Sequence, residues 1–280
     1  MKGLLEFWRR FRRNRAALAG LTVLGGVVVM ALTAPLLFPE DPWDMVAQPF
    51  LWPGQDSEYP LGSDMMGRDL ASALFHGAKV SLIIGFVATL MSVVIGTAAG
   101  AIAGYYRGPV DDLLMRVTEL FQTMPPFIFA IVVVAILSPS VVNVTIAIGL
   151  VSWPSVARLV RGEFLALRER EFVQAAVAIG MSDVRIVLTQ ILPNALGPII
   201  VTSSLMVATA ILTEAGLAFL GLGDPNVMSW GTVIGAGRDA LRSAWYITAL
   251  PGVAILLTVL ALNLVGDGLN DALNPRLKNR

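Results

Sequence analysis

The sequence EFLALREREFVQAAVAIGMSDVRIVLTQILP, residues 163–193, decides how the rest of the chain is arranged, because two apolar runs long enough to cross a bilayer flank it. Its middle, residues 172–181, has Gln174 as its single polar side chain. A helix of ten residues rises about 15 Å, roughly half the hydrocarbon thickness, so this piece cannot span a membrane. Charged residues flank it on both sides. An apolar segment held just outside a membrane has to be covered by protein.

Within this stretch, apolar residues recur at the spacing i, i+3, i+4, i+7 and predict one continuous helical face. They are Phe172, Ala175, Ala176 and Ile179. Gly180 is where this short helix can end, and Ser182 is a candidate N-cap for a second helix. We expect Pro193 and Pro198 to close that second helix. The stretch therefore predicts a helix–glycine–helix elbow, with alanines that let another backbone approach closely.

Composition excludes several classes of protein. The chain has 280 residues, 56% hydrophobic and 14% charged, with a mean hydropathy of +0.73, which is not the profile of an ordinary soluble protein. It has no cysteine, and His76 is its single histidine, which cannot form a metal cluster alone. No Gly-x-x-x-x-Gly-Lys-[Ser/Thr] loop and no converging catalytic cluster is present. We expect no enzymatic activity, no metal, no bound cofactor and no nucleic-acid partner.

Apolar runs predict an all-α polytopic membrane protein with six crossings. They cover about residues 16–38, 80–104, 113–137, 141–159, 196–222 and 246–265. The Lys and Arg residues on the far side from the elbow would be Arg68, Lys79, Arg238 and Arg242. The other sixteen of the twenty lie at the elbow side or its boundary, which predicts that the elbow and both termini are cytoplasmic.

This topology divides the chain into four parts. Residues 1–38 form a basic cytoplasmic N-terminus and the first crossing, and residues 39–79 form an acidic extracytoplasmic segment. Residues 80–266 form a five-helix core that contains the elbow, and residues 267–280 form a cytoplasmic tail. In the outer segment, Met66, Leu70 and Leu74 share one face of a predicted capped helix.

Two further patterns concern the crossings themselves. Gly96, Gly100 and Gly104 form a tandem small-xxx-small ridge that favours close helix packing. The adjacent Pro125 and Pro126 should bend or break the third crossing, because each removes a backbone hydrogen bond.

Glu214 is the only clear acid within a predicted crossing. A carboxylate at that depth is costly, so it is a functional candidate. A structural role, capping a broken helix or pairing with the outer loop, is equally open. Trp230 and Trp245 are expected to anchor the chain at the outer interface. The candidate outer-side or gate residues are Asp64, Arg68, Asp69, Glu214 and Trp230.

The elbow resembles the cytoplasmic coupling loop of the permease subunits of binding-protein-dependent ABC importers. The likeness lies in Gln174-Ala175-Ala176-x-x-x-Gly180 followed by Ile191-Leu192-Pro193. In that family the short helix sits in a groove of an ATPase subunit and transmits its closure to the membrane. Two positions depart from the pattern, with Gln174 in place of the usual Glu and Gln190 in place of an isoleucine. The resemblance implies a coupling site made of Arg170, Glu171, Phe172, Gln174, Ala175, Ala176, Gly180, Ser182 and Asp183.

The resemblance extends along most of the chain, to the dipeptide, oligopeptide and nickel branch of these permeases, and to the partner with one extra N-terminal helix. It rests on the segments LGSD at 61–64, GRD at 67–69, GA at 77–78, FLGLG at 219–223, SWG at 229–231, PG at 251–252 and NLVGDGL at 263–269. RGP at 107–109 and NPR at 274–276 depart from the branch's usual residues.

Such a resemblance implies several partners in a bacterial or archaeal plasma membrane. They are a homologous second permease, two ATPase subunits that carry ATP and Mg²⁺, an extracytoplasmic substrate-binding protein and membrane lipid. This chain would form half of the translocation path. Peptides, nickel chelates and glutathione-like thiols are all open as cargo.

Three other interpretations remain. A secondary transporter would usually need ionisable residues at the midplane and inverted repeats, and this chain offers only Glu214. A structural membrane subunit would leave the apolar elbow unexplained. A membrane-surface amphipathic helix would usually carry a lysine-rich polar face, which the elbow lacks.

Overall fold

The computed structural model describes the backbone of residues 2–273 and the side chains of residues 7–273, and no strand occurs in that range. The first half contains α1 (Lys2–Phe11), α2 (Arg15–Leu37), α3 (Leu70–Tyr106), α4 (Gly108–Gln122), α5 (Pro126–Leu137) and α6 (Val141–Arg168). The second half contains α7 (Glu171–Ala178), α8 (Asp183–Ile186), a π-helical turn (Val187–Ile191), α9 (Leu192–Phe219), α10 (Trp230–Gly237), a 3₁₀ turn (Arg238–Ala240) and α11 (Tyr246–Leu273). The predicted all-α architecture is confirmed.

Five helical stretches of the described chain are long and apolar enough to cross a membrane, and a sixth crossing results if α4 and α5 are counted as one broken span. The bend between α4 and α5 is 81°. Pro125 precedes α5 and Pro126 is its first residue, so the expected proline break is confirmed. α6 and α11 continue beyond the predicted crossings, to Arg168 and Leu273.

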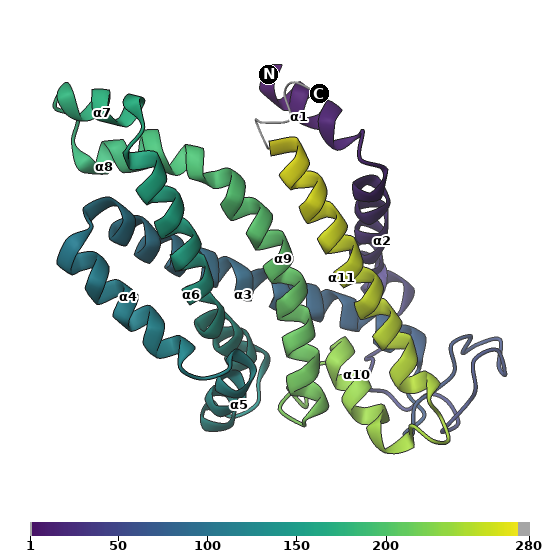
Figure 1. Cartoon of the computed structure of the whole chain (residues 1–280). Coiled ribbons are helices and arrows are strands. Elements are labelled where there is room, and N and C mark those ends of the chain that lie inside the picture. The colour runs from purple at the N-terminus through teal and green to yellow at the C-terminus, as the bar shows by residue number, and fades with distance from the viewer. Residues whose placement is uncertain (1, 274–280) are drawn as a thin grey trace.

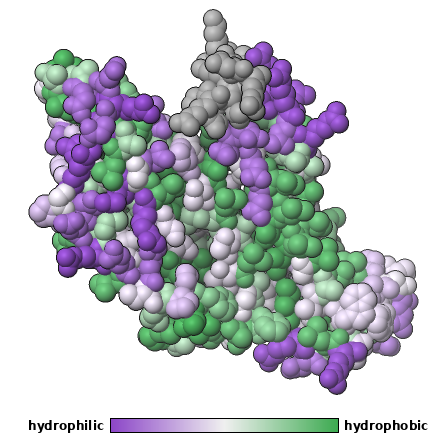
Figure 2. All heavy atoms as spheres, viewed as in Figure 1, coloured by the Kyte–Doolittle hydropathy of each residue, from purple (hydrophilic) through white to green (hydrophobic). Residues whose placement is uncertain are grey.

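The short helices and connecting segments lie at two opposite ends of the molecule (Figure 1). α7 and α8 lie at the same end as α1, whereas α10 and the segment before α3 lie at the other. Apolar side chains cover much of the middle of the visible face, and hydrophilic ones gather toward the ends (Figure 2). This distribution is the one expected of a protein that spans a bilayer.

The glycine ridge of α3 brings its backbone against α6, as predicted. A Cβ added to Gly96 would lie 2.7 Å from the carbonyl oxygen of Trp153, and one added to Gly100 would lie 2.3 Å from that of Ala157. At Gly104 the carbonyl oxygen of Arg161 would be 2.8 Å away. Only glycine permits this approach over three successive turns, so the ridge fixes how α3 and α6 pack.

Two predicted helix boundaries are wrong. The outer helix begins at Leu70 rather than before Met66, because the Asp69 carboxylate caps it by accepting from the backbone N–H groups of Ala71 (2.9 Å) and Ser72 (3.2 Å). That helix then continues through residue 79 to Tyr106 as one element.

The prolines of the elbow do not end its second helix. Pro193 lies in the first turn of α9 and Pro198 lies inside it, and the helical path runs from Asp183 to Phe219. The π-helical turn shifts the hydrogen-bond register, with the Leu192 N–H donating to the Val187 carbonyl. Membrane helices tolerate prolines where such local adjustments satisfy the backbone groups that a proline leaves free.

Candidate functional site

The elbow is a short helix with a defined start and end. α7 begins after Arg170, whose carbonyl accepts from the N–H groups of Val173 (3.0 Å) and Gln174 (3.1 Å). The negative charge of Glu171 in the first turn interacts favourably with the positive end of the helix dipole and so stabilises α7. Because of these contacts, α7 is a separate short helix and not an extension of α6.

Gly180 ends α7, as predicted. Its φ of +75° is a left-handed conformation that side chains with a Cβ rarely adopt. The Gly180 N–H donates to the Val177 carbonyl (2.9 Å) and the Met181 N–H to the Ala176 carbonyl (3.1 Å), which together form a Schellman motif. The chain therefore reverses between α7 and α8 at a glycine.

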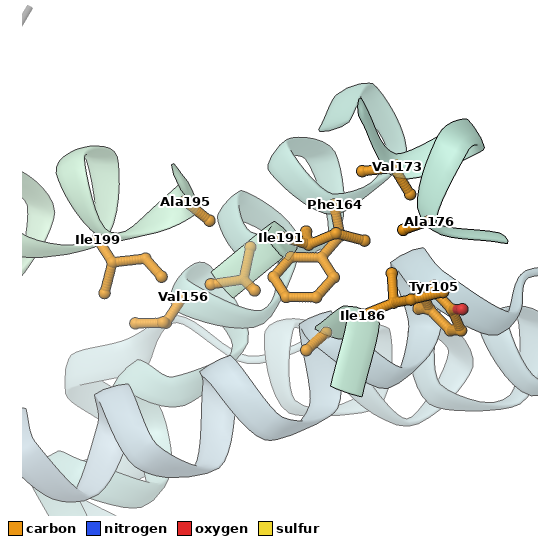
Figure 3. Packing of buried hydrophobic residues seen from close by; sticks show 11 residues of the cluster. Tyr105, Val156, Phe164, Val173, Ala176, Ile186, Ile191, Ala195 and Ile199 are labelled. Atoms are coloured by element: carbon orange, nitrogen blue, oxygen red, sulfur yellow. The ribbon is translucent and has the colours of Figure 1, made fainter. Parts of the chain in front are cut away.

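One face of α7 packs onto the transmembrane helices. Val173 is fully buried and Ala176 is 5% exposed, and both join a buried cluster with Tyr105, Phe164 and Ile186 (Figure 3). The same cluster contains residues at the ends of α3, α6 and α9. The elbow is thus anchored to three spans at once.

A face of α7 next to the buried one is apolar and uncovered. Phe172 is 41% exposed and Ile179 is 78% exposed, and Ala175 is exposed beside them. Val177, which is 53% exposed, lies on the other flank of the buried face. The predicted continuous face was therefore partly wrong, because Ala176 belongs to the buried side. Val173, which the apolar pattern did not select, lies on the buried side together with Ala176.

Polar contacts hold the elbow to the end of α3. The Tyr105 hydroxyl donates to the Asp183 carboxylate (2.7 Å), and the Arg168 guanidinium lies 5.3 Å from the centre of the Tyr105 ring. Arg107 and Glu169 form an ion pair next to them. Sequence reasoning missed Tyr105, because nothing in a local pattern links it to Asp183, 78 residues further along.

The other predicted coupling residues lie around the exposed face. Arg170, Glu171 and Ser182 are exposed. The Gln174 side-chain amide donates to the Arg168 carbonyl (3.2 Å). Ser182 occupies the N-cap position of α8, as predicted, although its side chain makes no capping hydrogen bond.

The outer candidates serve the chain's own structure. The Asp64 carboxylate accepts from the backbone N–H groups of Met66 (2.8 Å) and Arg68 (2.9 Å), and it lies 3.8 Å from the Arg68 guanidinium. That guanidinium also lies 4.4 Å from the ring centre of Trp43. Asp69 caps α3, as described above. Asp64, Arg68 and Asp69 therefore shape the outer segment and the start of α3.

Glu214 is 3% exposed and pairs with the outer loop that precedes α10, which is one of the structural roles expected of it. Its Oε1 atom accepts from the Ser229 hydroxyl (2.6 Å). Ser229 in turn caps α10, in a reciprocal pair of hydrogen bonds with Thr232. Glu214 thus holds the start of α10 against α9.

Trp230 is completely buried, so its predicted place at the membrane interface is wrong. Its indole N–H donates to the Leu74 carbonyl (2.9 Å) and its backbone N–H to the Ser81 hydroxyl (3.2 Å). A Cβ at Gly77 would lie 3.0 Å from its ring. Trp245, by contrast, is 57% exposed, as an interface residue would be.

Known families match two parts of the chain. Residues 96–279 match the family described as binding-protein-dependent transport system inner membrane component. Residues 4–58 match the N-terminal TM domain of oligopeptide transport permease C.

Curated relatives cover nearly the whole chain. The di/tripeptide transport system permease protein of Pseudomonas aeruginosa is 40% identical, over 99% of this chain and 93% of its own length. The dipeptide transport system permease protein of Haemophilus influenzae is 38% identical, over 98% and 95%. The glutathione transport system permease protein of Pectobacterium atrosepticum is 40% identical, over 98% and 91%.

The fold is also found among solved structures. A structure of the MetNI methionine ABC transporter in inward-facing conformations aligns with a TM-score of 0.60 at 19% identity, covering 72% of this chain and 96% of that chain. At this identity the likeness concerns the fold alone. The family match over residues 96–279 and the relatives that cover nearly the whole chain establish that this chain belongs to the binding-protein-dependent transport system inner membrane components.

Proposed function

We propose that this chain is one of two homologous permease subunits of an ATP-driven importer of short peptides, and that α7 is where it docks on an ATPase. One observation carries the proposal: α7 exposes Phe172, Ala175 and Ile179 on one face while its other face is buried against the spans. An apolar face outside the membrane is stable only under a protein cover. The names of the relatives support peptides as cargo.

The arrangement suggests how ATPase movement reaches the membrane. A force applied to the exposed face of α7 passes through Val173 and Ala176 to Phe164 of α6 and Ile186 of α8. The Tyr105–Asp183 hydrogen bond adds a direct link to α3. The chain itself would hydrolyse nothing, and ATP and Mg²⁺ would bind to the two ATPase subunits.

The remaining partners follow from the proposed sidedness. The end that carries α1 and α7 would face the cytoplasm, together with both termini, since most Lys and Arg residues of the described chain belong to elements at that end. The end with α10 would face the extracytoplasmic binding protein. An ion-coupled mechanism has less support, because Glu214 bonds to Ser229 at the start of α10.

Docking is tested by Ala175→Trp, which places an indole on the exposed face of α7. We expect the ATPase subunits to copurify poorly with this variant, because the added ring prevents close approach. Gln48→Trp is the matched control, since it adds the same ring to an exposed position in the outer segment. Equal ATPase recovery from both variants would contradict docking at Ala175.

Sidedness is tested in a chain that has no cysteine of its own. Single cysteines at Ala175 and at Asp239 place one thiol on α7 and one beside α10, both exposed. A membrane-impermeant maleimide added to intact cells should label Asp239→Cys and spare Ala175→Cys until the cells are opened. Labelling of Ala175→Cys in intact cells would overturn the proposed orientation and ATPase docking with it.

Cargo is tested by uptake of labelled dipeptides, oligopeptides, glutathione and nickel chelates in cells with and without this chain. We expect the dipeptide and oligopeptide signals to require both the chain and the binding protein. If only glutathione or only nickel uptake depends on the chain, peptide cargo is refuted while ATPase docking is unaffected.

A further inference from the structure

A basic corner is formed by the last turn of α1 and the connection to α2. It carries Arg9, Arg10, Arg12, Arg13 and Arg15 within seven residues. From residue 2 to residue 15 the chain has six basic residues and one acidic residue, Glu6. The apolar helix α2 follows directly, so this charge lies where the chain enters the membrane.

The corner has a fixed orientation, because Phe11 clamps it to α11. Phe11 is 3% exposed and packs with Ala17 and Ala272, and a Cβ at Gly268 would lie 2.9 Å from its ring. The connection is hydrogen-bonded throughout, with the N–H of Arg12 donating to the Trp8 carbonyl (3.0 Å). With Phe11 turned inward, the side chains of Arg9, Arg12 and Arg13 are exposed.

The positive charge of the corner is not neutralised by the described side chains. None of the ion pairs among them includes an arginine of residues 9–15. Asp271 at the end of α11 is the acid that contacts this region, and it accepts a hydrogen bond from Asn14 (3.0 Å) rather than from a guanidinium. Excess positive charge at a fixed surface favours an anionic partner.

We propose that this corner binds the headgroups of anionic phospholipids in the leaflet where α2 begins. Arginines directly before a membrane helix lie at headgroup depth, and such clusters attract anionic lipid. Trp8 stacks on Phe11 (5.8 Å between ring centres) and stays 45% exposed, as indoles at a membrane interface do. The corner is also well separated from α7, which argues for lipid rather than the ATPase as its occupant (Figure 1).

The test compares lipid binding by purified transporter carrying Arg9→Gln, Arg12→Gln and Arg13→Gln together with that of the unchanged transporter. Phosphatidylglycerol is titrated into the detergent-solubilised complex, and bound lipid is counted by native mass spectrometry, with phosphatidylethanolamine as the neutral comparison. At roughly fivefold per charge near the surface, the affinity for phosphatidylglycerol should fall on the order of 100-fold at low salt. The difference should shrink at high salt.

Two control variants make the result decisive. Replacing the same three arginines with lysine keeps the charge and should preserve phosphatidylglycerol binding. Arg238→Gln with Arg242→Gln removes exposed charge at the opposite end and should leave binding unchanged. Unchanged affinity in the triple Gln variant would overturn the proposal, as would equal losses in the Lys and Gln variants. Loss of copurifying ATPase with phosphatidylglycerol affinity unchanged would identify the corner as a protein-docking surface instead.

Discussion

The two ends of the molecule are built in opposite ways. The outer segment turns its polar groups inward: the Ser63 hydroxyl accepts from the Leu51 N–H (3.0 Å), and the Tyr246 hydroxyl donates to the Ser63 carbonyl (3.2 Å). The elbow instead keeps Phe172 and Ile179 in contact with solvent. Buried polar groups with partners specify one conformation, whereas exposed apolar groups gain free energy only from a partner. The outer segment therefore fixes much of its own shape through contacts within this chain, and we infer that the exposed apolar face of the elbow requires a second protein.

Trp230→Ala should give the largest loss of stability, because it removes a large, fully buried side chain from the outer end. Large-to-small changes of this kind cost about 3–5 kcal/mol, and the Leu74 carbonyl also loses the indole N–H that donates to it. Thermal unfolding of the purified complex should show a clear drop in melting temperature. Trp245→Ala, at a position 57% exposed, is the control and should change it little. Equal shifts would mean that Trp230 does not hold the outer end together.

Gly180→Val should affect the inner end without unfolding the chain. A Cβ there meets no atom within 4 Å, so the cost comes from the positive φ, about 1–2 kcal/mol. We expect the subunit to insert and the ATPases to hydrolyse ATP, while uptake is lost because α7 no longer presents its face correctly. Gly162→Val is the matched control, since that glycine also has free space but lies within α6. Normal uptake by Gly180→Val would rule out this role of the turn.

Tyr105→Phe should give the smallest effect, since it removes a single hydrogen bond between α3 and the elbow. A loss of about 1 kcal/mol, or roughly a fivefold shift in an equilibrium, is the expected scale. The ratio of peptide taken up to ATP hydrolysed should fall by at most about fivefold, and the amount of copurifying ATPase should be unchanged. Tyr106→Phe is the control, because that neighbour is 50% exposed and its hydroxyl makes no hydrogen bond to a described residue. If both variants behave alike, the contact with Asp183 does not contribute to coupling.

Sequence reasoning located features that depend on local chemistry. The proline break before α5, the glycine at the end of α7 and the glycine ridge of α3 each follow from what a residue permits its own backbone to do. These signals do not depend on knowing the neighbours. The apolar length of the runs likewise predicted the membrane helices.

Features that depend on distant neighbours were not predictable in the same way. Which face of α7 is buried depends on Phe164 and Ile186, so the apolar pattern alone did not separate Ala176 from Ala175. Trp230 suits a membrane interface by type, but Gly77 provides space for its ring inside the protein. Pro193 is tolerated because the π-helical turn before it changes the register of α9. The errors at α7 and at Trp230 arose where tertiary packing overrides a local preference.

The glycine ridge has a mechanical consequence. At Gly96, Gly100 and Gly104 the backbones of α3 and α6 approach closely, and α3 has no side chain at these three positions that could absorb a sliding motion. We expect α3 and α6 to tilt together as one rigid body. A small rotation imposed where Tyr105 and Phe164 contact the elbow would then also move the far ends of both helices, on the opposite side of the bilayer.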